Sequence, residues 1–172
     1  MILERMKQFR HPKKLQIECM TFLVNNTFNF DFAKLRNAFH ALDKDNSGTL
    51  EMSEIREAFA GMNIPAAELN QIFENIDLNH DGEINYTEFL AVTVDRKKAV
   101  TTNNLLFAFH HFDIDNTGVI THDNLKECFK REGRHFEDEE LNTMLAEVKC
   151  AEPGKITYEE FSVFMKQLVE NA

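Results

Sequence analysis

Two stretches of the chain place oxygen-bearing side chains at the same intervals: Asp43-Lys-Asp-Asn-Ser-Gly-Thr-Leu-Glu-Met-Ser-Glu54 and Asp77-Leu-Asn-His-Asp-Gly-Glu-Ile-Asn-Tyr-Thr-Glu88. Both have such a side chain at positions 1, 3, 5, 9 and 12, and both have glycine at position 6. A calcium ion takes about six to eight oxygen ligands, and a loop with this spacing supplies them from positions 1, 3, 5, 7 and 9 and from a bidentate carboxylate at position 12. Glycine permits the sharp turn in the middle. The pattern therefore predicts two calcium-binding loops.

The predicted ligands of the first loop are Asp43, Asp45, Ser47, the backbone carbonyl of Thr49, Glu51 and Glu54, and those of the second are Asp77, Asn79, Asp81, the carbonyl of Glu83, Asn85 and Glu88. A third stretch, residues 113–124, keeps the two acids and the glycine but ends in an asparagine. Because an amide offers one neutral oxygen where two charged ones are expected, this loop is predicted to be weaker, and whether it fills is left open. Its candidate ligands are Asp113, Asp115, Thr117, the carbonyl of Val119 and Asn124.

A fourth stretch, residues 149–160, keeps the frame but has lost most of its oxygen ligands. Lys149 stands where the first carboxylate belongs, and only Gly154, Thr157 and Glu160 match the pattern. We expect no metal in this loop. The predicted cofactor is thus Ca²⁺, with two sites, a third left open and an empty fourth loop.

Helices must position these loops, because apolar residues recur at helical spacing on both sides of each stretch. Four residues before the loops stand Phe39, Phe73, Phe109 and Leu145, and the following segments carry Phe59, Phe89, Phe129 and Phe161. We expect these side chains to form the cores, with a groove for a partner as the alternative role. The position-8 residues of the four loops are also apolar throughout, as Leu50, Ile84, Ile120 and Ile156.

All four stretches resemble the EF-hand. The resemblance implies that the position-8 residues form short two-stranded ribbons, which couple loop 1 with loop 2 and loop 3 with loop 4. The expected fold is all-α, with two calmodulin-like EF-hand lobes of two hands each, preceded by a basic amphipathic helical segment. The expected domains are the N-terminal segment (residues 1–28), the first lobe (29–94), a linker (95–104) and the second lobe (105–172).

The N-terminal segment differs in charge from the rest of the chain. The formal net charge is −10 at pH 7, yet the first 24 residues contain Arg5, Lys7, Arg10, Lys13 and Lys14 against only two acids, interleaved with apolar residues. Calmodulin-type lobes bind such segments, and anionic membranes attract them. The alternative is that the basic residues of this segment only form the solvent-exposed face of a helix. Because the lobes are on the same chain, at an effective concentration on the order of millimolar, self-recognition is the simpler hypothesis.

The string Arg5-Met-Lys-Gln-Phe9, then Lys13-Lys-Leu15 and then four EF-hands, resembles the junction and regulatory region of the calcium-dependent protein kinases. The resemblance implies a junction that contains Arg5, Met6, Lys7, Phe9, Arg10, Lys13 and Lys14. At resting calcium this junction is expected to hold off a serine/threonine kinase domain upstream of Met1, and calcium is expected to draw it onto its own lobes. Pro12 departs from the continuous helix usual there, so we expect a kink or break near Arg10 to Pro12.

The chain carries no glycine-rich phosphate loop and no kinase catalytic motifs, so it is not expected to be an enzyme by itself. The alternatives are a free-standing calmodulin-like sensor that binds a separate target helix, or a calcium buffer. Neither nucleic acid nor a transmembrane segment is expected. Three cysteines without metal-ligand spacing indicate free thiols and a cytoplasmic location, with membrane association through an upstream segment left open. His110 and His111, adjacent on one helix, point in different directions and are not predicted to share a zinc ion.

Overall fold

The computed structural model describes residues 2–8, 13–26 and 32–170. Within them the fold is built from helices, and the strands are only two residues long. The predicted all-α class is confirmed. The described residues divide between two compact units, the first made of residues 2–8, 24–26 and 32–95 and the second of residues 13–23 and 96–170. The predicted domain boundaries stay a prediction.

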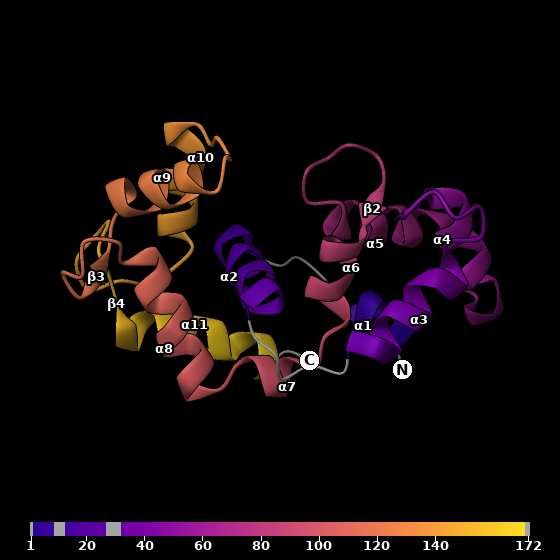
Figure 1. The fold of residues 1–172 in the computed structure, drawn as a ribbon, viewed down its shortest axis with the longest axis horizontal. Coiled ribbons are helices and arrows are strands. Elements are labelled where there is room, and N and C mark those ends of the chain that lie inside the picture. Colours follow the sequence, from indigo (N-terminus) through magenta and orange to yellow (C-terminus); the bar gives the residue numbers. More distant parts are fainter. Residues whose placement is uncertain (1, 9–12, 27–31, 171–172) are drawn as a thin grey trace. The chain divides into compact units, whose positions relative to one another are not determined.

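Unit 1 contains two helix–loop–helix hands. Its helices are α3 (Phe32–Leu42), α4 (Met52–Ala58), α5 (Ala66–Ile76) and α6 (Tyr86–Thr93), with a 3₁₀ turn at Ala60–Met62. Strands β1 (Thr49–Leu50) and β2 (Ile84–Asn85) pair antiparallel, with Leu50 opposite Ile84 (Figure 1). The ribbon therefore joins the two loops of this unit, as predicted.

Unit 2 repeats this arrangement. Its helices are α7 (Arg96–Ala99), α8 (Thr102–Phe112), α9 (His122–Arg131), α10 (Asp138–Ala146) and α11 (Tyr158–Glu170). Strands β3 (Val119–Ile120) and β4 (Ile156–Thr157) pair antiparallel, with Ile120 opposite Ile156. All four position-8 side chains are fully buried, so the coupling of loop 3 with loop 4 survives in a hand that has lost its ligands.

The eight apolar side chains predicted for the cores are all buried: Phe39, Phe59, Phe73, Phe89, Phe109, Phe129, Leu145 and Phe161. The rings from the entering and exiting helices meet edge-on or tilted. In unit 1 the centroids of Phe39 and Phe89 are 5.3 Å apart, and in unit 2 those of Phe109 and Phe161 are 5.7 Å apart. Aromatic pairs prefer this geometry, and they hold each entering helix against an exiting helix of its own unit. The core role predicted for these side chains is confirmed.

The N-terminal segment forms two helices, α1 (Ile2–Gln8) and α2 (Lys14–Asn26), and Lys13 between them is not helical. The break expected near Arg10 to Pro12 lies outside the described residues, as do Phe9 and Arg10 themselves. Helix α1 packs on α5 and α6 of unit 1. Met6 is fully buried there, and Arg5 donates from Nη1 to the Thr93 carbonyl at 2.6 Å.

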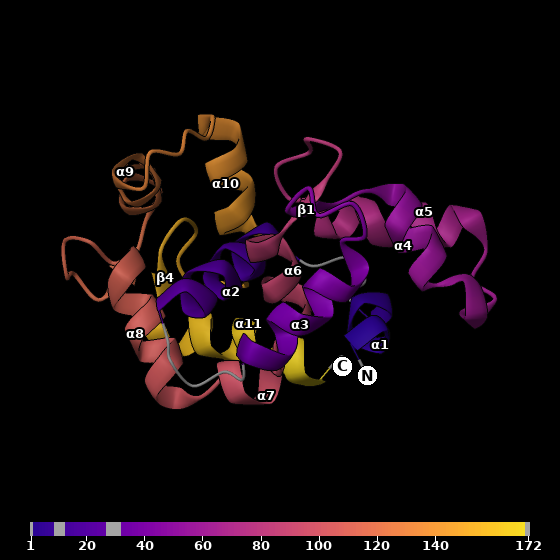
Figure 2. The ribbon, with the colours of Figure 1, turned by 45° about the vertical axis from the view of Figure 1, so that its right-hand side comes forward.

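A carboxylate of unit 2 caps the N-terminus of helix α2. The backbone N–H groups of Lys14 and Leu15 donate to Glu147 Oε1 and Oε2 at 2.8 and 3.0 Å. The first N–H groups of a helix have no partner within it, so Glu147, at the C-cap of α10, serves as a cap from elsewhere in the fold. Further along α2, Gln16 Nε2 donates to the Phe164 carbonyl of α11 at 2.8 Å, and the two helices lie side by side in both views (Figure 2).

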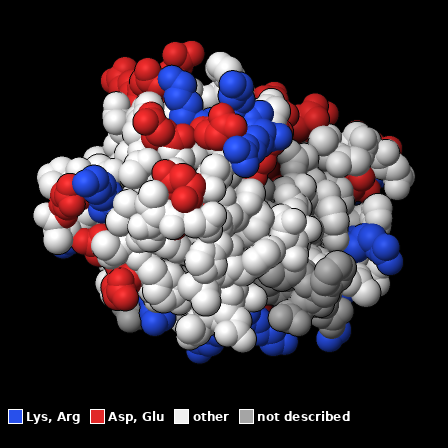
Figure 3. All heavy atoms as spheres, turned by 60° about the vertical axis from the view of Figure 1, so that its left-hand side comes forward, with Lys and Arg blue, Asp and Glu red and all other residues white. Residues whose placement is uncertain are grey.

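Charged side chains gather where α9 and α10 form the surface of unit 2. Lys126 Nζ lies 2.8 Å from Asp138, and Arg131 Nε lies 2.9 Å from Glu127. Acidic and basic groups stand together along the upper edge of the face in Figure 3, and the area below them is mostly uncharged. Among the helices described, none combines the length and the apolar character needed to cross a membrane.

We predict that Glu147→Ala loosens the docking of α2. The substitution removes the acceptor for two helix N-terminal N–H groups, and the loss of such a cap costs about 1–2 kcal/mol. Amide hydrogen exchange of residues 15–23 in the purified chain should accelerate roughly five- to thirtyfold. Glu139→Ala removes an exposed carboxylate from the same α10 and is the matched control. Equal acceleration in both variants would contradict the capping role.

Candidate calcium-binding loops

Loop 1 (residues 43–54) brings three of its predicted ligands together. One carboxylate oxygen from each of Asp43, Asp45 and Glu54 lies within 4.8 Å of the others. Asp43 is buried, and its two oxygens accept from the N–H groups of Ser47 and Gly48, both at 3.0 Å. The backbone of the loop thus aims the first carboxylate inward, where the other two converge.

Loop 2 (residues 77–88) repeats the inward carboxylate at position 1. Asp77 Oδ2 accepts from Gly82 N at 3.0 Å, while Asp77 Oδ1 is buried and has no hydrogen-bond partner among the described residues. Asn79 and Asp81 are linked to each other by Asn79 Nδ2 donating to Asp81 Oδ2 at 2.7 Å. A buried carboxylate oxygen without a donor is costly, and a cation removes that cost.

Left-handed backbone at two positions shapes the loops. The glycines at position 6 have φ values of 85–89° in loops 1 to 3, and the position-4 residues Asn46, His80 and Asn116 have φ values of 54–58°. Asparagine tolerates this region better than most residues, whereas His80 is a less usual occupant. These turns curl the backbone so that the position-6 N–H reaches the position-1 carboxylate.

The glutamate at position 12 ties the beginning of each of the first two loops to the helix that leaves it. Glu54 accepts from Lys44 N at 2.7 Å and from Glu51 N at 2.9 Å. Glu88 in the same way accepts from Leu78 N at 3.0 Å and from Asn85 N at 2.9 Å. Because each glutamate belongs to the exiting helix, a shift of its carboxylate toward a cation moves that helix.

The residues of loops 1 and 2 fit a calcium ion. Their donors are hard oxygens, which calcium prefers. Burial raises the pKa of Glu88 above its ordinary value, and nearby Asp77 adds to this, against the opposing effect of the backbone N–H donors. A carboxylate disfavoured in this way lacks a positive partner. Together with the unpartnered oxygen of Asp77, it marks loop 2 as a cation site in its chemistry as well as in its spacing.

Loop 3 (residues 113–124) satisfies its polar groups internally. Asn124 Oδ1 accepts from Thr121 N at 3.0 Å, so the single oxygen of this amide caps α9. The N–H at position 2, which reaches the closing glutamate in loops 1 and 2, here donates from Ile114 to the Phe112 carbonyl at 3.0 Å. Hydrogen bonds from Thr117 and then Asn124 lower the pKa of Asp115. The position-2 N–H of loop 3 therefore no longer reaches the residue at position 12.

Loop 4 (residues 149–160) is closed by protein contacts. Glu160 accepts from Ala151 N at 2.6 Å and from Thr157 N at 2.9 Å, and these donors lower its pKa. Lys155 pairs with Glu152 across a β-bridge. Pro153 supplies no N–H at position 5, and across residues 149–160, all of which the structure describes, only Gly154 has a positive φ. The closing carboxylate of Glu160 thus has two backbone donors, and that of Glu152 has a basic partner.

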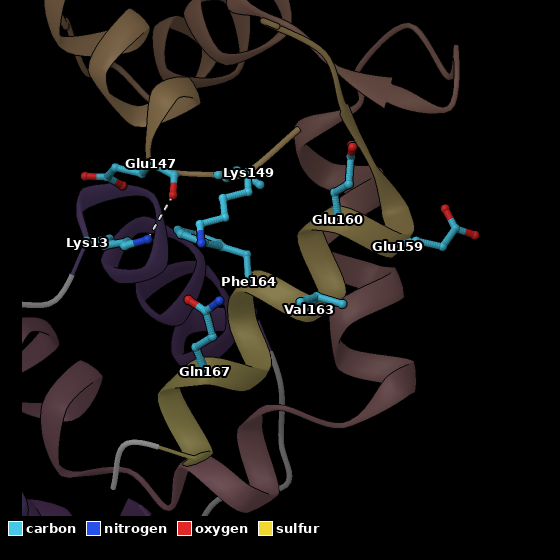
Figure 4. A pocket seen from close by; sticks show the side chains of 9 residues that line it. Lys13, Glu147, Lys149, Glu159, Glu160, Val163, Phe164 and Gln167 are labelled. Atoms are coloured by element: carbon cyan, nitrogen blue, oxygen red, sulfur yellow. Dashed lines mark hydrogen bonds between the residues drawn. The ribbon is translucent and has the colours of Figure 1, made fainter. Parts of the chain in front are cut away.

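A pocket of about 250 Å³ adjoins loop 4 and is bordered by the beginning of α2 and by α11 (Figure 4). Lys13 and Lys149 both line it, and Lys13 Nζ donates to the Glu147 carbonyl at 2.9 Å. The Lys13 ammonium also lies 5.0 Å from the centre of the Phe164 ring. Residues of the fourth loop and Lys13 of the N-terminal segment thus line the same pocket, and the group that holds Lys13 is the carbonyl of Glu147, two residues before the loop.

Comparison with known proteins agrees with this geometry. The family model described as an EF-hand domain pair matches residues 32–94 and again residues 102–166. The chain belongs to the EF-hand family. It is an EF-hand calcium-binding domain, and each of its two units contains one matched pair of hands.

The EF-hand chain is also similar to calcium-dependent protein kinases from plants. It is 35% identical to calcium-dependent protein kinase 9 of Arabidopsis thaliana over 167 residues, which are 96% of this chain and 31% of that kinase. Identity is 34% to calcium-dependent protein kinase 2 of Zea mays and to calcium-dependent protein kinase 19 of Oryza sativa subsp. japonica, again over 96% of this chain and over 32% and 31% of those kinases. The chain therefore spans about a third of the length of these relatives, and the resemblance that the sequence indicated is confirmed.

The structure brings Asp43, Asp45 and Glu54 of loop 1 together. The assignment of these and the other predicted residues as calcium ligands stays a prediction. Sequence reasoning missed the groups that receive α2, because Glu147 lies more than 130 positions away from Lys14 and no local pattern connects them. It also missed a cluster in unit 2 formed by His111, Cys128 and Glu132, whose ligand atoms lie within 4.8 Å of one another. The spacing of four between Cys128 and Glu132 was the only sequence signal for this cluster.

We predict that Glu88→Gln weakens calcium binding at loop 2 by roughly tenfold or more, because the loop then closes with one neutral oxygen in place of two charged ones. Isothermal titration of the purified chain with calcium measures the loss. Glu83→Gln removes the same charge from the same loop at a position whose predicted ligand is the backbone carbonyl, so its affinity should change little. A similar loss in both variants would show that overall charge matters and that position 12 does not.

Asn124→Glu should convert loop 3 into a stronger calcium site, since it restores the carboxylate that the other loops use for closure. Calorimetric titration should then show one more tight site than the unaltered chain. Asp123→Glu lengthens the adjacent exposed carboxylate by one carbon without bringing it into register, and it should leave the stoichiometry unchanged. An unchanged stoichiometry in Asn124→Glu would mean that another feature of loop 3 limits binding.

Proposed function

We propose that this chain is the calcium-responsive regulatory part of a serine/threonine protein kinase, and that it activates the linked kinase by sequestering the basic junction. Three relatives that cover nearly the whole chain are named calcium-dependent protein kinases. The observation that carries the proposal is the seating of both junction helices: α1 buries Met6 and donates from Arg5 to the Thr93 carbonyl of the first lobe, and Glu147 of the second lobe caps α2. A helix whose end is capped in this way is not available to occupy a kinase active site.

Specific polar contacts hold α2 on the second lobe in addition to the packing of its apolar residues. Glu18 of α2 is buried and accepts two hydrogen bonds from the Arg134 guanidinium, one of them at 2.8 Å. Lys14 Nζ lies 2.6 Å from Glu140. An acid that is buried without a partner is costly, so α2 fits this lobe because Arg134 is there to receive Glu18. Two basic residues of the junction, Arg5 and Lys14, thus meet acidic groups, as self-recognition requires.

We propose that the first lobe responds to calcium, as a switch, and that the second lobe holds α2 with little dependence on calcium, as an anchor. In the first lobe, Glu88 and Asp77 keep charge that protein donors do not fully satisfy, and calcium supplies the missing positive charge when it binds. In the second lobe, Asn124 and Glu160 are satisfied by backbone N–H groups. The first lobe therefore changes its free energy strongly with calcium concentration, whereas the second holds α2 with little dependence on it. For a response, the loaded lobe only has to bind the junction better than the empty one.

The finer assignments follow the same division. We propose two calcium ions, in loops 1 and 2, a weaker third site in loop 3 and none in loop 4. The ligand sets are those predicted from the sequence. A cytoplasmic location is proposed as well, because Cys19, Cys128 and Cys150 are free thiols, which persist in a reducing compartment.

Amide hydrogen exchange tests the division between switch and anchor within this chain. Calcium should increase the protection of α1 (residues 2–8) and change that of α2 much less. The double variant Glu54→Gln with Glu88→Gln should remove the response of α1, whereas Asp113→Ala should keep it. If the double variant left the response intact and Asp113→Ala removed it, the assignment of the switch to the first lobe would be wrong.

The role in kinase control is tested on the chain joined to its kinase domain, by phosphorylation of a peptide substrate as calcium is raised. The activation midpoint should move to higher calcium in the same double variant. A dye that binds apolar surface gives a separate readout on the isolated chain. If calcium left dye binding unchanged and the linked kinase equally active, a calcium buffer would be the better description. A dye response without kinase control would favour a free-standing sensor.

A further inference from the structure

A second set of potential ligands lies in unit 2, away from the oxygen ligands of loop 3. His111 is near the end of α8, Cys128 is on α9, and Glu132 is at the C-cap of α9. His111 Nε2 lies 2.9 Å from Glu132 Oε1 and 3.2 Å from Cys128 Sγ. One nitrogen, one sulfur and one oxygen therefore converge from the helix that enters loop 3 and the helix that leaves it.

We propose that His111, Cys128 and Glu132 form a zinc site that joins α8 to α9. A thiolate and an imidazole are ligands that zinc accepts and calcium does not. The site is therefore different in kind from the calcium loops. It does not depend on the proposed control of a kinase, because the chemistry of these three groups is the same in a sensor or a buffer.

The separations suit tetrahedral coordination. Zinc bonds of about 2.0–2.3 Å at tetrahedral angles place neighbouring ligand atoms roughly 3.3–3.6 Å apart. The measured 2.9 and 3.2 Å need only a small outward adjustment to accommodate the ion. Cys128 is buried, whereas the side chains of His111 and Glu132 are 26% and 32% exposed. This exposure leaves a route for entry and room for water as the fourth ligand.

The groups around the cluster support its geometry. The Phe22 ring of α2 stacks on the His111 ring, with centroids 3.8 Å apart and planes inclined by 13°, so the imidazole orientation is fixed by packing. Arg134, which also receives Glu18, lies 3.8 Å from Glu132, and this contact restrains the position of that carboxylate. Neighbours that orient metal ligands strengthen metal affinity. Zinc at this position would in turn hold the ring against which α2 packs.

A zinc ion at this site would also link the two helices of a hand whose loop lacks the glutamate at position 12. In loops 1 and 2, a glutamate at position 12 accepts from the N–H at position 2, whereas in loop 3 the corresponding N–H, of Ile114, does not reach Asn124. A metal bound by His111 and Cys128 would connect α8 to α9 without calcium. The third hand would then keep a fixed interhelical angle at resting calcium.

Zinc titration of the purified chain tests the proposal, with a phosphine reductant, saturating calcium and a chromophoric zinc chelator as competitor. We expect one zinc ion per chain that calcium does not displace. Cobalt substituted at the site should give a thiolate-to-cobalt charge-transfer band and the visible bands of tetrahedral coordination. Displacement of zinc by calcium, or a cobalt complex without thiolate charge transfer, would overturn the assignment.

Two ligand variants and one matched control locate the ion. Cys128→Ser should abolish the charge-transfer band, and Glu132→Gln, which changes a partly exposed side chain, should weaken zinc by roughly tenfold or more while the chain stays folded. Cys150→Ser removes a thiol outside the cluster and should behave like the unaltered chain. Unchanged zinc affinity in Glu132→Gln together with an unchanged band in Cys128→Ser would refute the site. Loss of the band in Cys150→Ser would refute it as well.

Discussion

Buried negative charge at the first and last positions of the loops is the constraint on which the rest of the molecule depends. Asp43, Asp77 and Asp113 are all buried at position 1, and Glu54 and Glu88 are buried at position 12. A carboxylate taken out of water must receive hydrogen bonds or a cation. In loop 1 three carboxylates converge within 4.8 Å of one another, and in loop 2 one oxygen of Asp77 has no donor. This deficit of positive charge makes the folding free energy of both loops depend on calcium. The helices, ribbons and cores keep these carboxylates buried, away from water.

Loops 3 and 4 show two ways of removing that deficit. In loop 3 the carboxylate at position 12 has become an amide, whose oxygen is used to cap α9. In loop 4 the glutamate remains, but Ala151 and Thr157 satisfy it, and its pKa is lowered where that of Glu88 is raised. The same residue type in the same frame therefore shows opposite pKa shifts, because Glu88 is buried and burial outweighs its backbone donors, whereas Glu160 is more exposed and its donors dominate. The ribbon between Ile120 and Ile156 preserves the architecture in both cases.

The sequence was informative wherever function depends on residues close together in the chain. The loop frames, the position-8 ribbons and the buried phenylalanines follow from spacing, because a twelve-residue loop and an amphipathic helix are local structures. The sequence could not indicate that Glu147 would cap α2 or that Arg134 would receive Glu18. Those contacts join distant segments, and nothing in the composition of either segment specifies the other. The same limit concealed the cluster of His111 with Cys128, which lie on two helices and converge only when the hand folds.

The division of the N-terminal segment has a thermodynamic consequence. If α1 and α2 formed one rigid helix, both lobes would gain or lose it together. Lys13 is not helical, and α1 and most of α2 (residues 14–23) belong to different units, so each can be released with its own free energy. The seating of α2 relies on Glu147 and Arg134, neither of which is a predicted calcium ligand. Release of α1 can therefore vary with calcium while α2 stays seated, and the seated helix keeps α1 at high effective concentration near its lobe. A switch tethered in this way rebinds quickly and needs only a modest change in affinity to alter its occupancy.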